Sequence, residues 1–153
     1  MTLDQLTKWD RRFLDLATTV GGWSKGPRKR VGAVIVRPDR SVASMGYNGP
    51  PRGYDDVAFL EMSREEQHKV VIHAERNAIR QMIFDERHVD KARYSFYVSP
   101  LYPCRDCAHS IIEWGFKRVV AYCGHTSDDW AQSAKEAKQL FIGNGVECLF
   151  VED

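Results

Sequence analysis

The sequence predicts an α/β fold in which a mixed five-stranded sheet lies between two layers of helices. Two apolar runs that flank a short turn are typical of an antiparallel hairpin. Three later apolar runs alternate with helical segments, which favours parallel strands joined by right-handed crossovers. The predicted strands are residues 31–36, 41–47, 94–100, 118–123 and 146–151. The chain has 153 residues without a repeat or linker, so a single domain over residues 1–153 is expected.

The first element is predicted to be an amphipathic helix over residues 2–20. Its apolar side chains recur at helical spacing, and Thr2 and Gln5 stand in the positions of a capping box. Two glycines at residues 21–22 follow as a stop signal. This helix is expected to face the core.

Loops and the hairpin come next in the chain. A basic loop over residues 26–30 leads into the hairpin, whose turn is predicted at the Pro-Asp-Arg of residues 38–40. The stretch GYNGPPRGYDD, residues 46–56, holds three glycines and two prolines and is therefore predicted to be a loop. Residues 57–69 are polar and ambiguous, so no element is assigned to them.

Three further helices are predicted in the second half of the chain. The first begins at His73, the second spans residues 104–114 and the third spans residues 129–142. They alternate with the last three strands, which is the pattern that indicates parallel neighbours.

Composition and charge narrow the class of protein. The apolar fraction is 43%, and 22 Lys and Arg nearly balance 21 Asp and Glu, which disfavours a bulk nucleic-acid-binding surface. The first 30 residues lack the apolar core of a signal peptide, and no apolar run approaches membrane-spanning length. We therefore expect a cytoplasmic protein without membrane or nucleic-acid partners. In that reducing compartment the four cysteines are not expected to form a disulfide framework.

The C-x-x-C pair Cys104 and Cys107 is open to three interpretations. At a helix start it fits a thioredoxin-like redox site about as well as a metal site, because the helix N-terminus favours thiolate in both. Two buried structural thiols are the third interpretation. A c-type haem site does not fit, because Ala108 rather than His follows the second cysteine.

Residues upstream of this pair favour a metal. His73 and Glu75 form an H-x-E motif at another helix start, and Pro103 extends the cysteine pair to P-C-x-x-C. One imidazole and two thiolates supply three ligands for a tetrahedral Zn²⁺ and leave a fourth position open. The predicted ligands are therefore His73, Cys104 and Cys107, with Glu75 beside the metal without binding it. The combined motif is the known signature of zinc-dependent nucleobase deaminases.

Over nearly its whole length the chain resembles the deoxycytidylate (dCMP) deaminases of the cytidine deaminase superfamily. The resemblance rests on VGAVIV, GYNGPPRG with two aspartates following, HAERNAI, VSPLYPCRDCAHSIIEWGFKRVV and GHTSDDW. The GYNG-x-PRG loop is the part that indicates dCMP deaminase in particular. The resemblance implies a three-layer cytidine-deaminase-like fold and one catalytic Zn²⁺ per chain. It also implies that Glu75 shuttles protons in the hydrolysis of dCMP to dUMP and ammonia, a step of pyrimidine deoxynucleotide metabolism.

The same resemblance implies the substrate contacts. Asn48 is expected to bind the deoxyribose 3′-hydroxyl, and the backbone around Ala74 and Ser99 is expected to hold the pyrimidine edge. Arg28 is expected to bind the 5′-phosphate. The alternative for Arg28 is a solvated basic loop, because three basic residues follow one another there.

Family members are commonly oligomers that dCTP activates and dTTP inhibits through the glycine-rich loop. The residues implicated here are Asn48, Gly49, Arg52 and Gly53. Mg²⁺ is expected to accompany the effector triphosphate, and a homo-oligomer, either hexamer or dimer, is expected. Pro50 and Tyr54 depart from the usual residues of this loop, which bears on regulation rather than on the chemistry. The cysteines and histidines outside the motif have no compact ligand spacing, so no second zinc is expected.

Two other functions stay open at this point. A deaminase of tRNA or single-stranded polynucleotides needs a cationic groove with stacking aromatic residues, which a net charge of +1 disfavours. A non-catalytic nucleotide sensor would have a fully ligated zinc, with His109 or His125 as the fourth ligand, and would have no use for Glu75. Arg105 and Asp106 are expected to face outward near the site entrance or a subunit contact.

Overall fold

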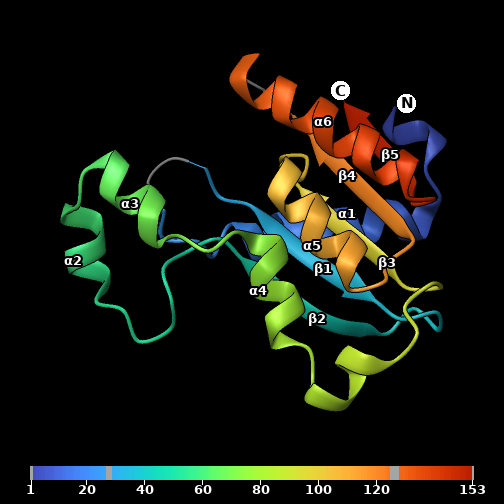
Figure 1. The fold of residues 1–153 in the computed structure, drawn as a ribbon, viewed down its shortest axis with the longest axis horizontal. Helices are drawn as coiled ribbons and strands as arrows, with labels where there is room; N and C mark the ends of the chain where they lie inside the picture. The colour runs from blue at the N-terminus through green and yellow to red at the C-terminus, as the bar shows by residue number, and fades with distance from the viewer. Residues whose placement is uncertain (1, 27–28, 125–127, 153) are drawn as a thin grey trace.

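A single five-stranded sheet forms the centre of the computed structural model, which describes residues 2–26, 29–124 and 128–152. The strand order is β2-β1-β3-β4-β5 (Figure 1). The strands are β1 (Gly32–Val36), β2 (Val42–Tyr47), β3 (Ser95–Ser99), β4 (Arg118–Cys123) and β5 (Glu147–Glu152). β1 pairs antiparallel with both β2 and β3, whereas β3, β4 and β5 run parallel. The predicted mixed sheet is confirmed, and every strand end lies within one residue of its predicted place.

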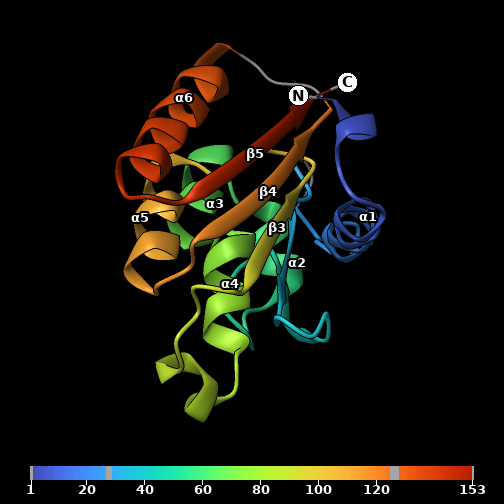
Figure 2. The same ribbon diagram turned by 90° about the vertical axis from the view of Figure 1, so that its right-hand side faces the viewer.

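Helices cover both faces of the sheet. They are α1 (Lys8–Gly21), α2 (Asp56–Glu61), α3 (Arg64–Val70), α4 (Ala74–Gln81), α5 (Arg105–Glu113) and α6 (Asp128–Gly143), with 3₁₀ turns η1 (Leu3–Gln5) and η2 (Phe84–His88). Seen along the sheet, α1 lies on one side, and α4, α5 and α6 lie on the other (Figure 2). The three predicted layers are therefore present. None of the described helices combines the length and the apolar character needed to cross a bilayer.

Strand β1 shows how the core divides between the two faces. Ala33 and Ile35 belong to the apolar cluster under α4, α5 and α6, whereas Val34 and Val36 belong to the cluster under α1. All four side chains are buried. A strand covered on both faces is apolar throughout rather than alternating, as the run VGAVIV is.

The first predicted helix is wrong at its start. Thr2 and Gln5 do form a capping box, but it caps only the short turn η1. The chain then takes an extended conformation at Leu6, and the Thr7 hydroxyl accepts the Asp10 amide at 3.1 Å to begin α1 anew. Two successive caps thus replace one continuous helix over residues 2–20.

Two helices occupy the segment that sequence periodicity left ambiguous. The Asp55 carboxylate accepts the Val57 amide at 2.9 Å and so caps α2. Ser63 and Glu66 form a capping box at the start of α3. Both helices are too short to show a clear apolar period, so their capping residues predict them better than periodicity does. In Figure 1 both helices extend beyond the end of the sheet, away from α5 and α6.

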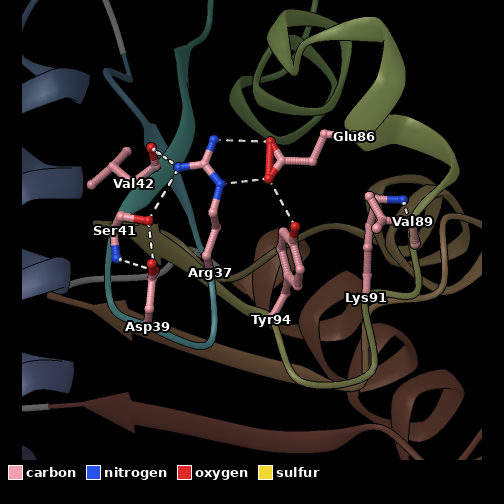
Figure 3. A network of polar contacts seen from close by, with 8 residues as sticks. All are labelled: Arg37, Asp39, Ser41, Val42, Glu86, Val89, Lys91 and Tyr94. Carbon is pink, nitrogen blue, oxygen red and sulfur yellow. Dashed lines mark hydrogen bonds and ion pairs between the residues drawn. The ribbon is translucent and has the colours of Figure 1, made fainter.

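A polar network ties the hairpin to the segment between α4 and β3 (Figure 3). Arg37 of the hairpin donates to both oxygens of Glu86, at 2.5 and 3.0 Å, and to the Val42 carbonyl at 2.9 Å. Tyr94 donates to Glu86 at 2.8 Å. The Lys91 ammonium is buried against the Val89 carbonyl at 3.1 Å. The network stabilises the sheet at the end where β1 finishes and β3 begins.

Candidate active site

Three side chains with metal-binding donor atoms meet where α4 and α5 begin. The Nδ1 atom of His73 lies 3.3 Å from the Cys107 Sγ atom and 3.5 Å from the Cys104 Sγ atom. All three donor atoms lie within 4.8 Å of one another, and they form the one such group in the described part of the chain. His73 is the N-cap of α4 and Cys104 is the N-cap of α5. The two helix N-termini therefore converge as the sequence predicts.

Spacing and donor type fit a zinc ion. In a tetrahedral site with Zn–S of about 2.3 Å and Zn–N of about 2.0–2.1 Å, a sulfur and a nitrogen ligand lie about 3.6 Å apart. The observed separations of 3.3 and 3.5 Å are close to this value. Imidazole and thiolate are the ligands that zinc prefers in proteins. The group therefore has the composition and the compactness of a three-ligand zinc site.

The cluster also favours the ionised form of one thiol. Hydrogen bonds from the Cys107 thiol and amide and from His73 lower the pKa of Cys104 to about 4, against the opposing effect of burial. The neighbouring Cys104 sulfur and burial raise the pKa of Cys107. The Cys104 thiolate in turn raises the pKa of His73. A metal cation bound here would replace the protons that Cys104, Cys107 and His73 share, and it would balance the negative charge of the thiolates.

Glu75 lies next to this group in the first turn of α4. Its side chain is 4% exposed and hydrogen-bonds with the Cys107 thiol. Burial raises the pKa of Glu75. A carboxyl group with a raised pKa holds a proton more readily than a solvated one does.

A cavity of about 320 Å³ opens above the cluster. The described residues that line it come from five parts of the chain: Gly26, Lys29, Val31, Asn48, Phe59, Arg64, Gln67, His68, Val71, His73, Ala74, Glu75, Leu101, Tyr102 and Trp130. Its size suits a small organic ligand. His73, Ala74 and Glu75 thus share one cavity with Asn48.

Asn48 anchors the loop that precedes β1. Its Oδ1 atom accepts the Val31 amide at 2.8 Å, and its Nδ2 atom donates to the Lys29 carbonyl at 2.8 Å. Its backbone carbonyl accepts the Ser24 hydroxyl at 2.6 Å. Asn48 is also a lining residue of the cavity. One residue therefore holds the loop before β1 in place and forms part of the cavity wall.

Two other predicted contacts lie in different surroundings. Ser99 is fully buried, and its hydroxyl pairs with that of Thr18 on α1 at 2.6 Å. Its side chain therefore faces α1 rather than the cavity, and only its backbone can serve a ligand. Arg28 falls outside the described residues. Arg105 and Asp106 are exposed, as expected, and Arg105 pairs with Glu136 on α6 at 3.3 Å.

The rest of the glycine-rich loop lies away from the cavity lining. Arg52 donates to Gln81 at the end of α4, and Gly53 has a positive φ of 83°. Gly49 exchanges two backbone hydrogen bonds with Ile72, at 3.1 and 2.8 Å. The structure thus does not group Gly49, Arg52 and Gly53 around the cavity that Asn48 lines. Gly49 and Arg52 instead contact the residue before His73 and the end of α4, respectively.

Sequence reasoning missed the α3 wall of the cavity. Arg64, Gln67 and His68 stand at the helical spacing i, i+3 and i+4 and all line the cavity. The Ser63–Glu66 capping box was the available signal for a helix there. Tyr102 and Trp130 were missed as well. Tyr102 directly precedes the P-C-x-x-C motif without being part of it, and Trp130 reaches the cavity from α6, more than 20 residues after the motif.

The chain is similar to known proteins that contain the same zinc-binding region. The family model of the cytidine and deoxycytidylate deaminase zinc-binding region matches residues 7–123. A protein of Aliivibrio fischeri, described as an uncharacterized deaminase, is 36% identical over 150 residues that cover 95% of each chain. The deoxycytidylate deaminase of Homo sapiens is 33% identical over 94% of this chain and 79% of its own length. The crystal structure of the dCMP deaminase of cyanophage S-TIM5 with dCMP and dUMP has a TM-score of 0.74 at 20% identity, over 96% of this chain and 99% of that one. That structural similarity shows a shared fold.

Proposed function

The chain belongs to the cytidine and deoxycytidylate deaminase family, and from this premise we propose that it hydrolyses dCMP to dUMP and ammonia. The observation that carries the proposal is the buried Glu75 beside the group of His73, Cys104 and Cys107 at one end of a cavity of ligand size. The names of the human relative and of the cyanophage structure support dCMP as the substrate.

His73, Cys104 and Cys107 would hold one Zn²⁺. Zinc bound there would lower the pKa of water to about 7 and so supply a nucleophile at neutral pH. The three ligands come from two helix starts, so their positions depend on how α4 and α5 pack against the sheet. The hydrogen bond from the Cys107 amide to the Cys104 sulfur, at 3.4 Å, supports the thiolate form of that ligand.

Glu75 would move the protons of the reaction. Attack of water at C4 of the cytosine ring releases one proton, which Glu75 delivers to N3. The second water proton goes by the same carboxyl group to the amino nitrogen, and the C4–N4 bond breaks to release ammonia. Burial raises the pKa of Glu75, so its carboxyl group holds the transferred proton more readily than a solvated carboxyl group does.

Backbone and amide groups would orient the nucleotide. The side chain of Asn48 would bind the 3′-hydroxyl, and the backbone around Ala74 would hold the pyrimidine edge; both residues line the cavity, which supports these roles. The backbone near Ser99 is the third proposed contact. Because Asn48 also fixes Val31 and Lys29, its loss would disturb the cavity wall as well as the sugar contact.

The glycine-rich loop would carry the regulation. We propose Asn48, Gly49, Arg52 and Gly53 as the site of dCTP activation and dTTP inhibition, with Mg²⁺ accompanying the triphosphate. Two backbone hydrogen bonds join Gly49 to Ile72, and Ile72 immediately precedes His73. A movement of the loop at Gly49 would therefore be passed directly to His73. A homo-oligomer is part of this proposal.

Ammonia release from dCMP by the zinc-loaded protein tests the function. Parallel assays would contain deoxycytidine, dCTP and a short cytosine-containing oligonucleotide as alternative substrates. We expect dCMP to be the preferred substrate by kcat/KM. Preference for the oligonucleotide would indicate a polynucleotide deaminase, and zinc binding without turnover would indicate a sensor. Repeating the dCMP assay with added dCTP or dTTP and Mg²⁺ tests the regulation separately.

A further inference from the structure

A second cavity lies at the other end of the sheet from the active site. Its volume is about 230 Å³, and it shares no lining residue with the cavity of the active site. Strand β3 relates the two cavities. Ser95 at its start lines the second one, whereas Leu101 and Tyr102, which follow its end, line the first. No step of the proposed reaction uses the second cavity, so a ligand held there is distinct from the substrate.

Four arginines and one acid supply the charge of the second cavity. They are Arg37, Arg40, Arg93, Arg118 and Asp10. Arg118 pairs with Asp10 at 2.9 Å and with the exposed Glu147 at 3.4 Å. Arg37 pairs with Glu86 at 2.5 Å (Figure 3). Among the residues that the structure describes, no acid pairs with Arg40 or with Arg93. Two guanidinium groups of this cavity thus keep their full charge.

Arg40 is held at the cavity without an acidic partner. Its φ of 71° in the hairpin turn is a left-handed conformation that glycine or asparagine usually adopts, and its amide donates to the Arg37 carbonyl at 2.9 Å. Its guanidinium lies 5.0 Å from the centre of the Trp9 ring, which also lines the cavity. The neighbouring Asp39 instead accepts the amide and the hydroxyl of Ser41, at 2.9 and 2.6 Å. The turn and the Trp9 ring therefore position a cation without neutralising it.

Size and charge together favour a small anion. The volume is below the range of about 300–1,000 Å³ that is typical of sites for drug-sized molecules. Two unpaired guanidinium groups balance a dianion, and each can donate two parallel hydrogen bonds to phosphate oxygens. Lys8 and Arg12 add positive charge nearby, since they lie 5.9 and 4.7 Å from the centre of the Trp9 ring. A phosphate group satisfies all of these features.

We propose that the second cavity binds a phosphate dianion, free or as the end of a small phosphomonoester, through Arg40 and Arg93. The phosphate connects the hairpin turn, which carries Arg40, to the segment before β3, which carries Arg93. Because it binds the folded chain, it stabilises the protein against unfolding. The proposal is independent of the deaminase function, since the two cavities have no lining residue in common.

Calorimetric titration of the zinc-loaded protein with inorganic phosphate and with methyl phosphate tests the site. We expect one phosphate per chain and a Kd that rises about 10-fold in Arg40→Gln and in Arg93→Gln. Both arginines are exposed and unpaired among the described residues, so both variants are expected to fold like the wild type. Arg11→Gln is the matched control, because it removes the charge of an exposed arginine of α1 that lines neither cavity.

Lys29→Gln separates this site from the active-site cavity, which Lys29 lines. Phosphate should bind this variant as it binds the wild type, and it should raise the Tm of both more than that of Arg40→Gln or Arg93→Gln. Binding of methyl phosphate as well assigns the site to phosphomonoesters, and binding of inorganic phosphate alone assigns it to the free ion. Absence of phosphate binding by the wild type overturns the proposal, as does a loss in Lys29→Gln or Arg11→Gln equal to that in Arg93→Gln. Each of these results is obtained without turnover of dCMP.

Discussion

Asp10 of α1 and Arg118 of β4 are 108 residues apart in sequence and form a bidentate ion pair, with both N–O distances at 2.9 Å. Tyr97 of β3 donates to the same carboxylate at 2.7 Å. The Asp10 side chain is 5% exposed. This pair joins the first helix to the middle of the sheet.

Replacement of Asp10 by Asn is expected to lower the free energy of unfolding at pH 7 by about 2 kcal/mol, because it removes the bidentate partner of Arg118. Arg118 then keeps only the 3.4 Å ion pair with the exposed Glu147. Burial raises the pKa of Asp10, but hydrogen bonds from Arg118 and Tyr97 outweigh it and hold the pKa below its usual 3.8. Since the folded-state pKa is the lower one, the carboxylate stabilises the fold above about pH 4 and loses that effect as pH falls further. Urea denaturation between pH 3 and 7 should show the difference between wild type and variant shrinking below pH 4. Asp15→Asn, at an exposed residue of the same helix, is the control, and a pH-independent difference would contradict the assignment.

Glu75→Gln is expected to retain zinc and to lose at least about 10³-fold in kcat for dCMP, since it removes a proton carrier and no ligand. Metal content by atomic absorption and ammonia release together make the measurement. Glu113→Gln, at an exposed residue of α5, should behave like the wild type. A Glu75→Gln enzyme within tenfold of wild-type turnover would show that another group moves the protons.

Cys104→Ser is expected to reduce zinc well below one ion per chain, because two of three ligands do not replace a thiolate of lowered pKa. Chelation of wild-type zinc should abolish turnover, and added Zn²⁺ should restore it. Cys148→Ser, which lies outside the cluster, should keep its metal. Two zinc ions per wild-type chain would contradict the expectation of a single site.

Gly46→Ala is expected to destabilise the protein by about 3 kcal/mol and to weaken zinc binding. A Cβ atom there would lie 2.4 Å from the Ala78 amide nitrogen and 2.8 Å from the Ala74 carbonyl, both backbone atoms of α4 that cannot rotate away. Moving α4 would move His73 at its start. Thermal unfolding with and without zinc measures both effects. Gly143→Ala on α6 has no atom within 4 Å of the added carbon, and a gain of about 0.5–1 kcal/mol is expected there instead.

Most strands and helices could be predicted from the pattern of apolar residues in the sequence. The five strands are short apolar runs bounded by turn residues, and α4 and α5 follow apolar periods, so their existence depends on neighbours in the chain. The start of α1 at Lys8 could not be predicted from apolar periodicity, and neither could the helices α2 and α3. Hydroxyl and carboxylate caps determine where these three helices begin.

The residues that could bind zinc and move protons were predictable from the sequence, because His73 and Glu75 form one short motif and Cys104 and Cys107 form another. The side chains that surround the ligand depend on the packing of the whole chain. Arg64 and His68 became a cavity wall because Gln67 anchors α3 through Phe59, and Ser99 turned to Thr18 because β3 packs on α1. Such long-range packing produces no periodic pattern or motif in the sequence, because it depends on which surfaces pack against each other in the folded protein.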